Sequence, residues 1–179
     1  MKKGPFEVIK SRTIYQNPWI KVCEDEVIRP DGTNGIFGIV EYSPGVSILA
    51  LDKDKNVYLI KEYMYAIERD DIMLPAGGVD KDETPLTAAK RELLEETGLE
   101  SEEWIALGEA NPLTMVVKAP FYNFLALNVK KVSEGEKEII TLKRTLDEVV
   151  KMVEDGTISH SGAISTIFKA KLYLDKNSK

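Results

Sequence analysis

Three glutamates near the middle of the chain have a spacing that could bind a metal ion. Glu92, Glu95 and Glu96 stand at positions i, i+3 and i+4, so on a helix they share one face, about 5–6 Å apart at Cβ. Like charges at this spacing destabilise a helix by roughly 0.2–0.5 kcal/mol per pair. A divalent cation would reverse that cost, and carboxylate oxygens suit Mg²⁺, Mn²⁺ or Ca²⁺ better than zinc. The alternative interpretation is a solvated acidic face, which is the commoner meaning of such a cluster taken alone.

The glutamates belong to a helix that the sequence predicts from Pro85 to Thr97. Thr84 is a favourable N-cap, and proline is well tolerated at the first helical position. Gly98 is placed to end the helix in a left-handed conformation. Apolar residues at helical spacing predict the buried face, and these are Leu86, Ala89 and Leu93. A loop at residues 74–78 precedes the helix.

The rest of the chain indicates strands first and helices last. Runs of β-branched and aromatic residues predict strands at 13–15, 19–29, 36–42, 46–51, 57–63, 104–108, 121–129 and 138–143. The apolar runs 46–51 and 57–63, separated by a polar turn, predict a β-hairpin. Apolar stripes at 146–153 and 164–172 predict two helices, the first ending at Gly156. The fold class is therefore α/β (α+β), a mixed sheet with helices on its faces. We expect residues 1–42 to form a small strand-rich N-terminal element and residues 43–179 the main domain.

Composition excludes several classes of protein. The chain has 179 residues, a net charge of −6 and one cysteine, so an intramolecular disulfide is excluded and a general nucleic-acid binder is not expected. The first residues lack the apolar core of a signal peptide, and no apolar run approaches the roughly 20 residues that span a membrane. We expect a cytoplasmic protein without a membrane partner. His160 and Cys23 are expected to be packing or surface residues.

The residues around the glutamates form a longer pattern. From Gly77 to Leu99 the chain is G-x5-E-x7-R-E-L-L-E-E-T-G-L. This segment resembles the Nudix box, and every fixed position of the box is matched. The resemblance implies a Nudix-like α/β/α sandwich and a hydrolase that uses Mg²⁺ (or Mn²⁺) to cleave a diphosphate linkage. It implies that Glu92, Glu95 and Glu96 hold metal, together with the backbone carbonyl of Ala76.

Other residues of the box have expected structural roles. Gly77 allows a tight backbone turn before the helix. Glu83 falls near the helix N-terminus, where an anion is favoured. Glu83 is expected to pair with Arg91 and so fix the loop against the helix. For both residues we favour this structural role over a part in the chemistry.

A general base is also needed, and two locations are open. Glu95 is one candidate. In relatives that cleave ADP-ribose, a glutamate from a late loop activates the water, and Glu134 and Glu136 are the nearest matches to its E-x-E pattern. The alternative for this loop is solvated surface.

The wider chain, from about Tyr15 to Leu172, resembles the ADP-ribose and nucleoside diphosphate sugar pyrophosphatase branch. That branch implies a homodimer formed through the N-terminal element, a small-molecule nucleoside diphosphate substrate, and Tyr15, Trp19 or Arg29 as contributors to the nucleoside pocket. The chain departs from the branch at Glu62-Tyr63-Met64, where Gln-Tyr-Arg is common. The alternatives are a nucleoside triphosphate or dinucleotide pyrophosphohydrolase and, from another class, a nucleotide-sugar sensing module without turnover.

Overall fold

The computed structural model describes residues 1–177, which fall into two compact units. The N-terminal unit comprises residues 1–44 together with residues 111–120, and the main unit comprises residues 45–110 and the chain from residue 121 onward. The segment 111–120 thus belongs to the same unit as residues 1–44, although it is distant from them in sequence. The domain expected at residues 43–179 ends with residues 178 and 179, which lie outside the described part of the chain.

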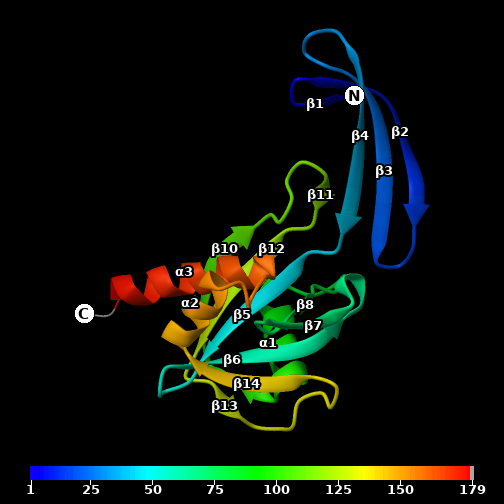
Figure 1. The fold of residues 1–179 in the computed structure, drawn as a ribbon. Helices are drawn as coiled ribbons and strands as arrows, with labels where there is room; N and C mark the ends of the chain where they lie inside the picture. Colours follow the sequence, from blue (N-terminus) through cyan, green and yellow to red (C-terminus); the bar gives the residue numbers. More distant parts are fainter. Residues whose placement is uncertain (178–179) are drawn as a thin grey trace. The chain divides into compact units, whose positions relative to one another are not determined.

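The N-terminal unit is a five-stranded sheet (Figure 1). Its order is β1 (Lys2–Lys3), β2 (Phe6–Gln16), β3 (Ile20–Ile28), β4 (Asn34–Tyr42) and β11 (Val117–Lys118). All neighbours are antiparallel except β11, which pairs parallel to β4. The loop between β3 and β4 turns on Asp31, whose side chain accepts a hydrogen bond from Thr33 N at 2.9 Å, as an Asx-type turn requires.

The main unit is built on a seven-stranded mixed sheet. The order along it is β10 (Glu103–Ala110), β12 (Phe121–Leu127), β5 (Gly45–Leu51), β6 (Asn56–Met64) and β14 (Ile140–Thr145). Two further strands attach to it: β7 (Arg69–Met73) to β6 and β8 (Ala76–Gly78) to β5. A 3₁₀ turn, η1 (Tyr65–Ile67), joins β6 to β7, and β9 (Leu99–Glu100) pairs with β13 (Lys130–Lys131). The central strand β5 pairs parallel with β12.

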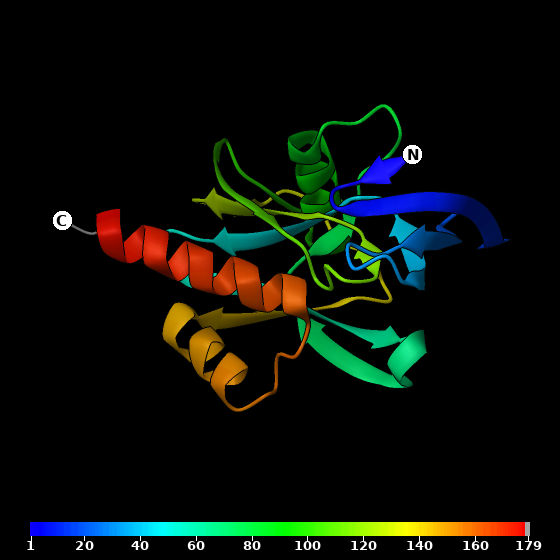
Figure 2. The same ribbon diagram turned by 90° about the horizontal axis from the view of Figure 1, so that it is seen from above.

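Helices cover both faces of this sheet. Helix α1 (Pro85–Thr97) lies on one side, and α2 (Leu146–Glu154) and α3 (Ser161–Asn177) lie on the other (Figure 2). Successive side chains of β5 point to opposite faces of the sheet. Ile48 therefore belongs to the apolar cluster under α1, while Leu49 belongs to the cluster under α2 and α3. The predicted α/β/α sandwich with a mixed sheet is therefore confirmed. Among the described helices, none is long and apolar enough to cross a membrane.

Two local predictions hold only in part. The expected hairpin of β5 and β6 is paired only next to its turn, at Ala50 with Tyr58 and Leu51 with Val57. Beyond these pairs the strands diverge, and each takes another partner, β8 for β5 and β7 for β6. Part of the expected loop at 74–78 is thus the short strand β8. The backbone before α1 is fixed by sheet hydrogen bonds as a result.

Candidate functional site

Helix α1 presents the acidic face, and its ends are defined by local interactions. The Thr84 side chain accepts a hydrogen bond from Thr87 N at 3.2 Å, and Gly98 adopts a left-handed φ of 68° while donating to Leu94 O at 2.8 Å. Leu93 is fully buried against the sheet. The prediction for Leu86 is wrong, since this side chain is 38% exposed, and the buried stripe runs instead through Ala88, Ala89 and Leu93.

Arg91 connects the loop before α1 to the acidic face of the helix. Its Nε donates to Glu83 Oε1 at 3.1 Å and its Nη2 to Glu83 Oε2 at 2.9 Å, a two-point pairing that fixes orientation as well as distance. Nη2 also donates to Gly78 O at 3.0 Å. Nη1 donates to Glu92 Oε1 at 2.7 Å and to Glu95 Oε2 at 3.1 Å. The expected ion pair between Glu83 and Arg91 is present, and its hydrogen bond holds the pKa of Glu83 below the ordinary value.

Strand β8 packs directly against the acidic face of α1. A Cβ on Gly77 would lie 2.0 Å from the carboxyl carbon of Glu92, so any other residue would require this carboxylate to move from its position. The neighbouring Ala76 donates its N–H to Glu96 Oε2 at 3.0 Å. The pairing of β8 with β5 therefore brings the Ala76 backbone beside Glu96, and Ala76 is the residue whose carbonyl the resemblance to the Nudix box implies as a metal ligand.

The carboxylates of this face are in an unfavourable environment for negative charge. Glu96 is only 7% exposed, and burial raises its pKa to about 8, with further contributions from the charges of Glu92, Glu62 and Glu136. The hydrogen bond from Ala76 opposes this shift without cancelling it. Burial also raises the pKa of Glu92. Burying carboxylates that repel one another raises the free energy of the folded state unless a cation or a proton neutralises their charge.

The donor set fits a hard divalent cation. Carboxylate oxygens from Glu92, Glu95 and Glu96, with a nearby backbone carbonyl, match the ligands that Mg²⁺ and Mn²⁺ prefer. Within residues 1–177, no three acidic, histidine or cysteine side chains are arranged around a common metal-sized point. Arg91 Nη1 instead pairs with both Glu92 and Glu95.

The late loop with the other candidate glutamates also reaches this end of α1. Glu136 N donates to Glu95 O at 2.9 Å. The Glu134 side chain is 97% exposed, and its partner is Lys131 at 3.6 Å. Glu62 on β6 was not singled out as a site residue by the sequence, although its charge contributes to the raised pKa of Glu96. The sequence marked Glu62 only as part of a departure from the branch at residues 62–64, and its nearness to Glu96 was not predictable because its position depends on the divergence of β5 and β6.

The expected nucleoside-pocket residues all lie in the N-terminal unit, but the structure does not bring them together in one chain. Tyr15 and Trp19 flank the turn between β2 and β3 and are 53% and 75% exposed. Arg29 follows the other end of β3, where its guanidinium packs over Gly35 and donates to Asn34 O. A nine-residue strand such as β3 spans about 30 Å. Trp19 and Arg29 of one chain therefore cannot line the same small-molecule pocket.

His160 and Cys23 have structural positions. His160 Nδ1 accepts a hydrogen bond from Ala163 N at 3.2 Å at the start of α3, and burial lowers the pKa of its ring. Its ring packs edge-to-face on Phe121, with 5.7 Å between centroids. Cys23 lies half-buried in β3.

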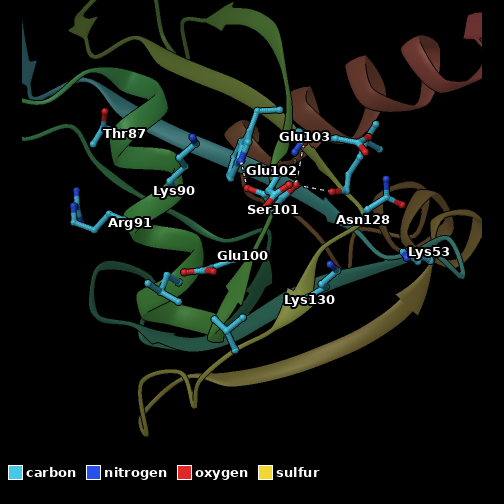
Figure 3. Close-up of a pocket in the computed structure, with 14 residues that line it drawn as sticks. Lys53, Thr87, Lys90, Arg91, Glu100, Ser101, Glu102, Glu103, Asn128 and Lys130 are labelled. Atoms are coloured by element: carbon cyan, nitrogen blue, oxygen red, sulfur yellow. Dashed lines mark hydrogen bonds between the residues drawn. The ribbon is translucent and has the colours of Figure 1, made fainter.

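A cavity of about 810 Å³ lies on another side of α1. Figure 3 shows Thr87, Lys90 and Arg91 along the helix, with Glu100 and Lys130 across from them. Its lining includes Arg91 but none of Ala76, Glu92, Glu95 and Glu96. Its charges are mixed, since lysines from three segments face Glu100, Glu102 and Glu103. The cavity is therefore separate from the acidic face and has no dominant charge to select a ligand.

Comparison with known proteins identifies the family. A family model described as the NUDIX domain matches residues 41–154, and one described as the nucleoside diphosphate sugar hydrolase N-terminal domain matches residues 6–40. An ADP-ribose pyrophosphatase of Mycobacterium tuberculosis is 28% identical over 173 residues, covering 93% of this chain and 84% of that protein. A methanol dehydrogenase activator of Bacillus methanolicus is 28% identical over 166 residues, covering 90% of each.

A solved structure agrees with this assignment at the level of the fold. The crystal structure of an ADP compounds hydrolase has a TM-score of 0.84 to this chain at 18% identity, covering 96% of this chain and 95% of that one. The matched NUDIX region extends over more than half of the sequence and contains the complete box from Gly77 to Leu99. Because the NUDIX model covers residues 41–154 and the Glu83–Arg91 pair and the glutamates of α1 stand at the positions of the box, this chain belongs to the NUDIX domain family.

Proposed function

We propose that this Nudix hydrolase cleaves ADP-ribose or another nucleotide sugar at its diphosphate linkage, with Mg²⁺ or Mn²⁺ as cofactor, releasing a nucleoside monophosphate and a sugar phosphate. The observation that carries the proposal is the buried Glu96 carboxylate beside Glu92, on a helix that matches the whole Nudix box. The N-terminal match to a nucleoside diphosphate sugar hydrolase domain supports the substrate class.

The charged residues of the box divide into metal ligands and residues that position them in this proposal. Glu92, Glu95, Glu96 and the Ala76 carbonyl would hold the cation, which when bound would neutralise diphosphate oxygens and lower the pKa of a water. Glu96 also orients the Ala76 backbone through the hydrogen bond at 3.0 Å. Arg91 aligns the Glu92 and Glu95 carboxylates, and Glu83 fixes Arg91 in turn.

For the general base, the contacts favour Glu136 over Glu134, with Glu95 as the other candidate. Glu136 is attached through its backbone to Glu95, and its charge affects the pKa of Glu96. Glu134 points into solvent at 97% exposure. A base must lie within reach of the water near the metal ligands, and these two interactions support Glu136 as the loop glutamate that serves as base.

We further propose a homodimer that works in the cytoplasm. The N-terminal unit exposes large apolar side chains on its strands, and such surfaces mark protein–protein contacts; they include Ile9, Ile14, Tyr15, Trp19 and Ile36. In a dimer, Tyr15 or Trp19 of one chain and Arg29 of its partner could approach one nucleoside. In a monomer, only one end of β3 could contribute.

The decisive experiment is hydrolysis of a substrate panel with Mg²⁺ and with Mn²⁺, and after chelation of metal. The panel contains ADP-ribose, ADP-glucose, GDP-mannose, a dinucleotide and a nucleoside triphosphate, with products identified by chromatography. Release of a nucleoside monophosphate and a sugar phosphate, lost on chelation and in Glu96→Gln, supports the proposal. Pyrophosphate from the triphosphate would instead favour a triphosphate pyrophosphohydrolase. Binding of ADP-ribose without turnover would favour a sensing module.

A further inference from the structure

The loop with the candidate base glutamates is hydrogen-bonded to the last turn of α1. We name residues 132–138, between β13 and β14, the acidic loop. Val132 N and Ser133 N both donate to Gly98 O, at 2.9 and 3.3 Å. Farther along, Glu136 N donates to Glu95 O at 2.9 Å. These bonds satisfy carbonyls that a helix C-terminus leaves without partners, so helix and loop stabilise each other.

Two glycines make this contact possible. A Cβ on Gly98 would lie 2.0 Å from Ser133 O, and a Cβ on Gly135 would lie 2.3 Å from Glu96 O and 3.0 Å from Thr97 Cα. Gly98 also needs its left-handed φ of 68° to end the helix. Gly135 has no positive φ, so close approach is what requires glycine at this position.

A lysine strengthens the same contact from the start of the loop. Lys131 Nζ donates to Thr97 O at 2.9 Å and lies 3.6 Å from Glu134 Oε2. A cation at a helix C-terminus is electrostatically favourable. Its strand β13 is aligned with β9 by the pairing of Lys131 with Leu99. The acidic loop therefore leaves the sheet at a fixed point beside the end of α1.

We propose that Gly135 is a positioning residue for hydrolysis: its bare backbone lets the acidic loop lie against the Glu96–Thr97 backbone and so holds Glu136 beside the carboxylates of α1. This inference rests on the proposed function. Gly135 touches neither metal nor substrate in the proposal and acts only through the placement of Glu136. Lys131 assists by fixing the start of the same loop.

The contact distances indicate the size of the effect. In Gly135→Ala the new methyl group would start 2.3 Å from Glu96 O, so the loop must retreat by about 1 Å to reach an ordinary van der Waals separation. A displacement of about 1 Å in a catalytic group can reduce the rate about 100-fold. We expect kcat to fall roughly 10- to 100-fold with little change in KM, because substrate contacts are not altered.

The first test is hydrogen exchange, which does not depend on activity. In the wild type, the amide of Glu136 should be protected by its bond to Glu95 O, and peptides covering the acidic loop should report this. Gly135→Ala should accelerate exchange there at least about tenfold. The matched control is Gly38→Ala in β4, where an added Cβ meets nothing within 4 Å. Unchanged exchange in Gly135→Ala would overturn the proposal.

The second test is a double-mutant cycle with Glu136→Gln, measured as kcat and KM. If Gly135 acts through Glu136, then Gly135→Ala should cost activity in the wild type but less than about twofold more in the Glu136→Gln background. Equal losses in both backgrounds would refute the proposal. Should Gly135→Ala fail to fold, Lys131→Met gives the same comparison with a smaller expected loss. If the wild type cleaves none of the panel, the proposed function fails, while hydrogen exchange still decides whether Gly135 holds the loop.

Discussion

The buried carboxylate of Glu96 should make the metal-free protein less stable than a variant without that charge. The pKa of Glu96 is about 8 in the folded protein against an ordinary 4.5, so the folded state disfavours the ionised form. In Glu96→Gln, the amide oxygen can still accept the hydrogen bond from Ala76 N, while the repulsion from Glu92, Glu62 and Glu136 is removed. We therefore expect the substitution to stabilise the protein when metal is chelated.

The size and sign of the effect depend on pH. A raised carboxyl pKa means that the wild type loses stability, relative to the variant, as pH rises from 4.5 to about 8. The loss is about 1.4 kcal/mol per pH unit in this window, which gives about 3 kcal/mol at pH 7 and a plateau above pH 8. For a protein of this length, 3 kcal/mol corresponds to roughly 6–12 °C in Tm.

The assay is thermal or urea unfolding of both proteins in chelator from pH 4 to pH 9. Near pH 4 the two should have similar stability, and the gap should widen with pH. Excess Mg²⁺ should then stabilise the wild type by about 2.7 kcal/mol at 100 times Kd and leave Glu96→Gln nearly unchanged. Replacing the exposed Glu138 by Gln controls for removal of one charge. Parallel pH profiles for wild type and Glu96→Gln would refute the reasoning.

Two further predictions concern the scaffold of the site. Leu93→Ala should lower the free energy of unfolding by about 2–5 kcal/mol, because Leu93 is fully buried between α1 and the sheet. Leu172→Ala, at a residue 69% exposed, should change it by less than about 0.5 kcal/mol. Urea unfolding of both variants measures the difference. Thr84→Ala should lower stability by about 1 kcal/mol through loss of the N-cap bond from Thr87 N, while Thr84→Ser should retain it, and equal stability of the two variants would contradict the capping role.

The helix of the site could be predicted from the sequence because its determinants are local. Thr84, Pro85 and Gly98 define both ends of α1 within the sequence window that they occupy. The pairing of Glu83 with Arg91 likewise joins residues that are close in sequence. Leu86 is the exception on this helix. The apolar spacing predicted the buried face of the helix correctly, but it wrongly included Leu86, the residue nearest the N-terminus.

The surroundings of the helix could not be predicted, because they depend on pairing between distant segments. The divergence of β5 and β6 admits β7 and β8, and no local pattern signals it. The last strand begins at Ile140 rather than at residue 138, since residues before it belong to the acidic loop on α1. The contact of Gly135 with Glu96 is equally distant in sequence, as is the effect of Glu62.

The parallel pairing of β5 with β12 has a consequence for how the protein acquires its site. Val46 pairs with Tyr122, and α1 with all its glutamates lies between these two residues in the chain. Contacts between segments so far apart form slowly, because a long loop must close before they contribute stability. During synthesis, β5 cannot pair with β12 until residues 121–127 have emerged from the ribosome. Chains that stop before residue 121 should therefore collapse without completing the central sheet, and α1 should gain its fixed place only when the second half of the chain arrives.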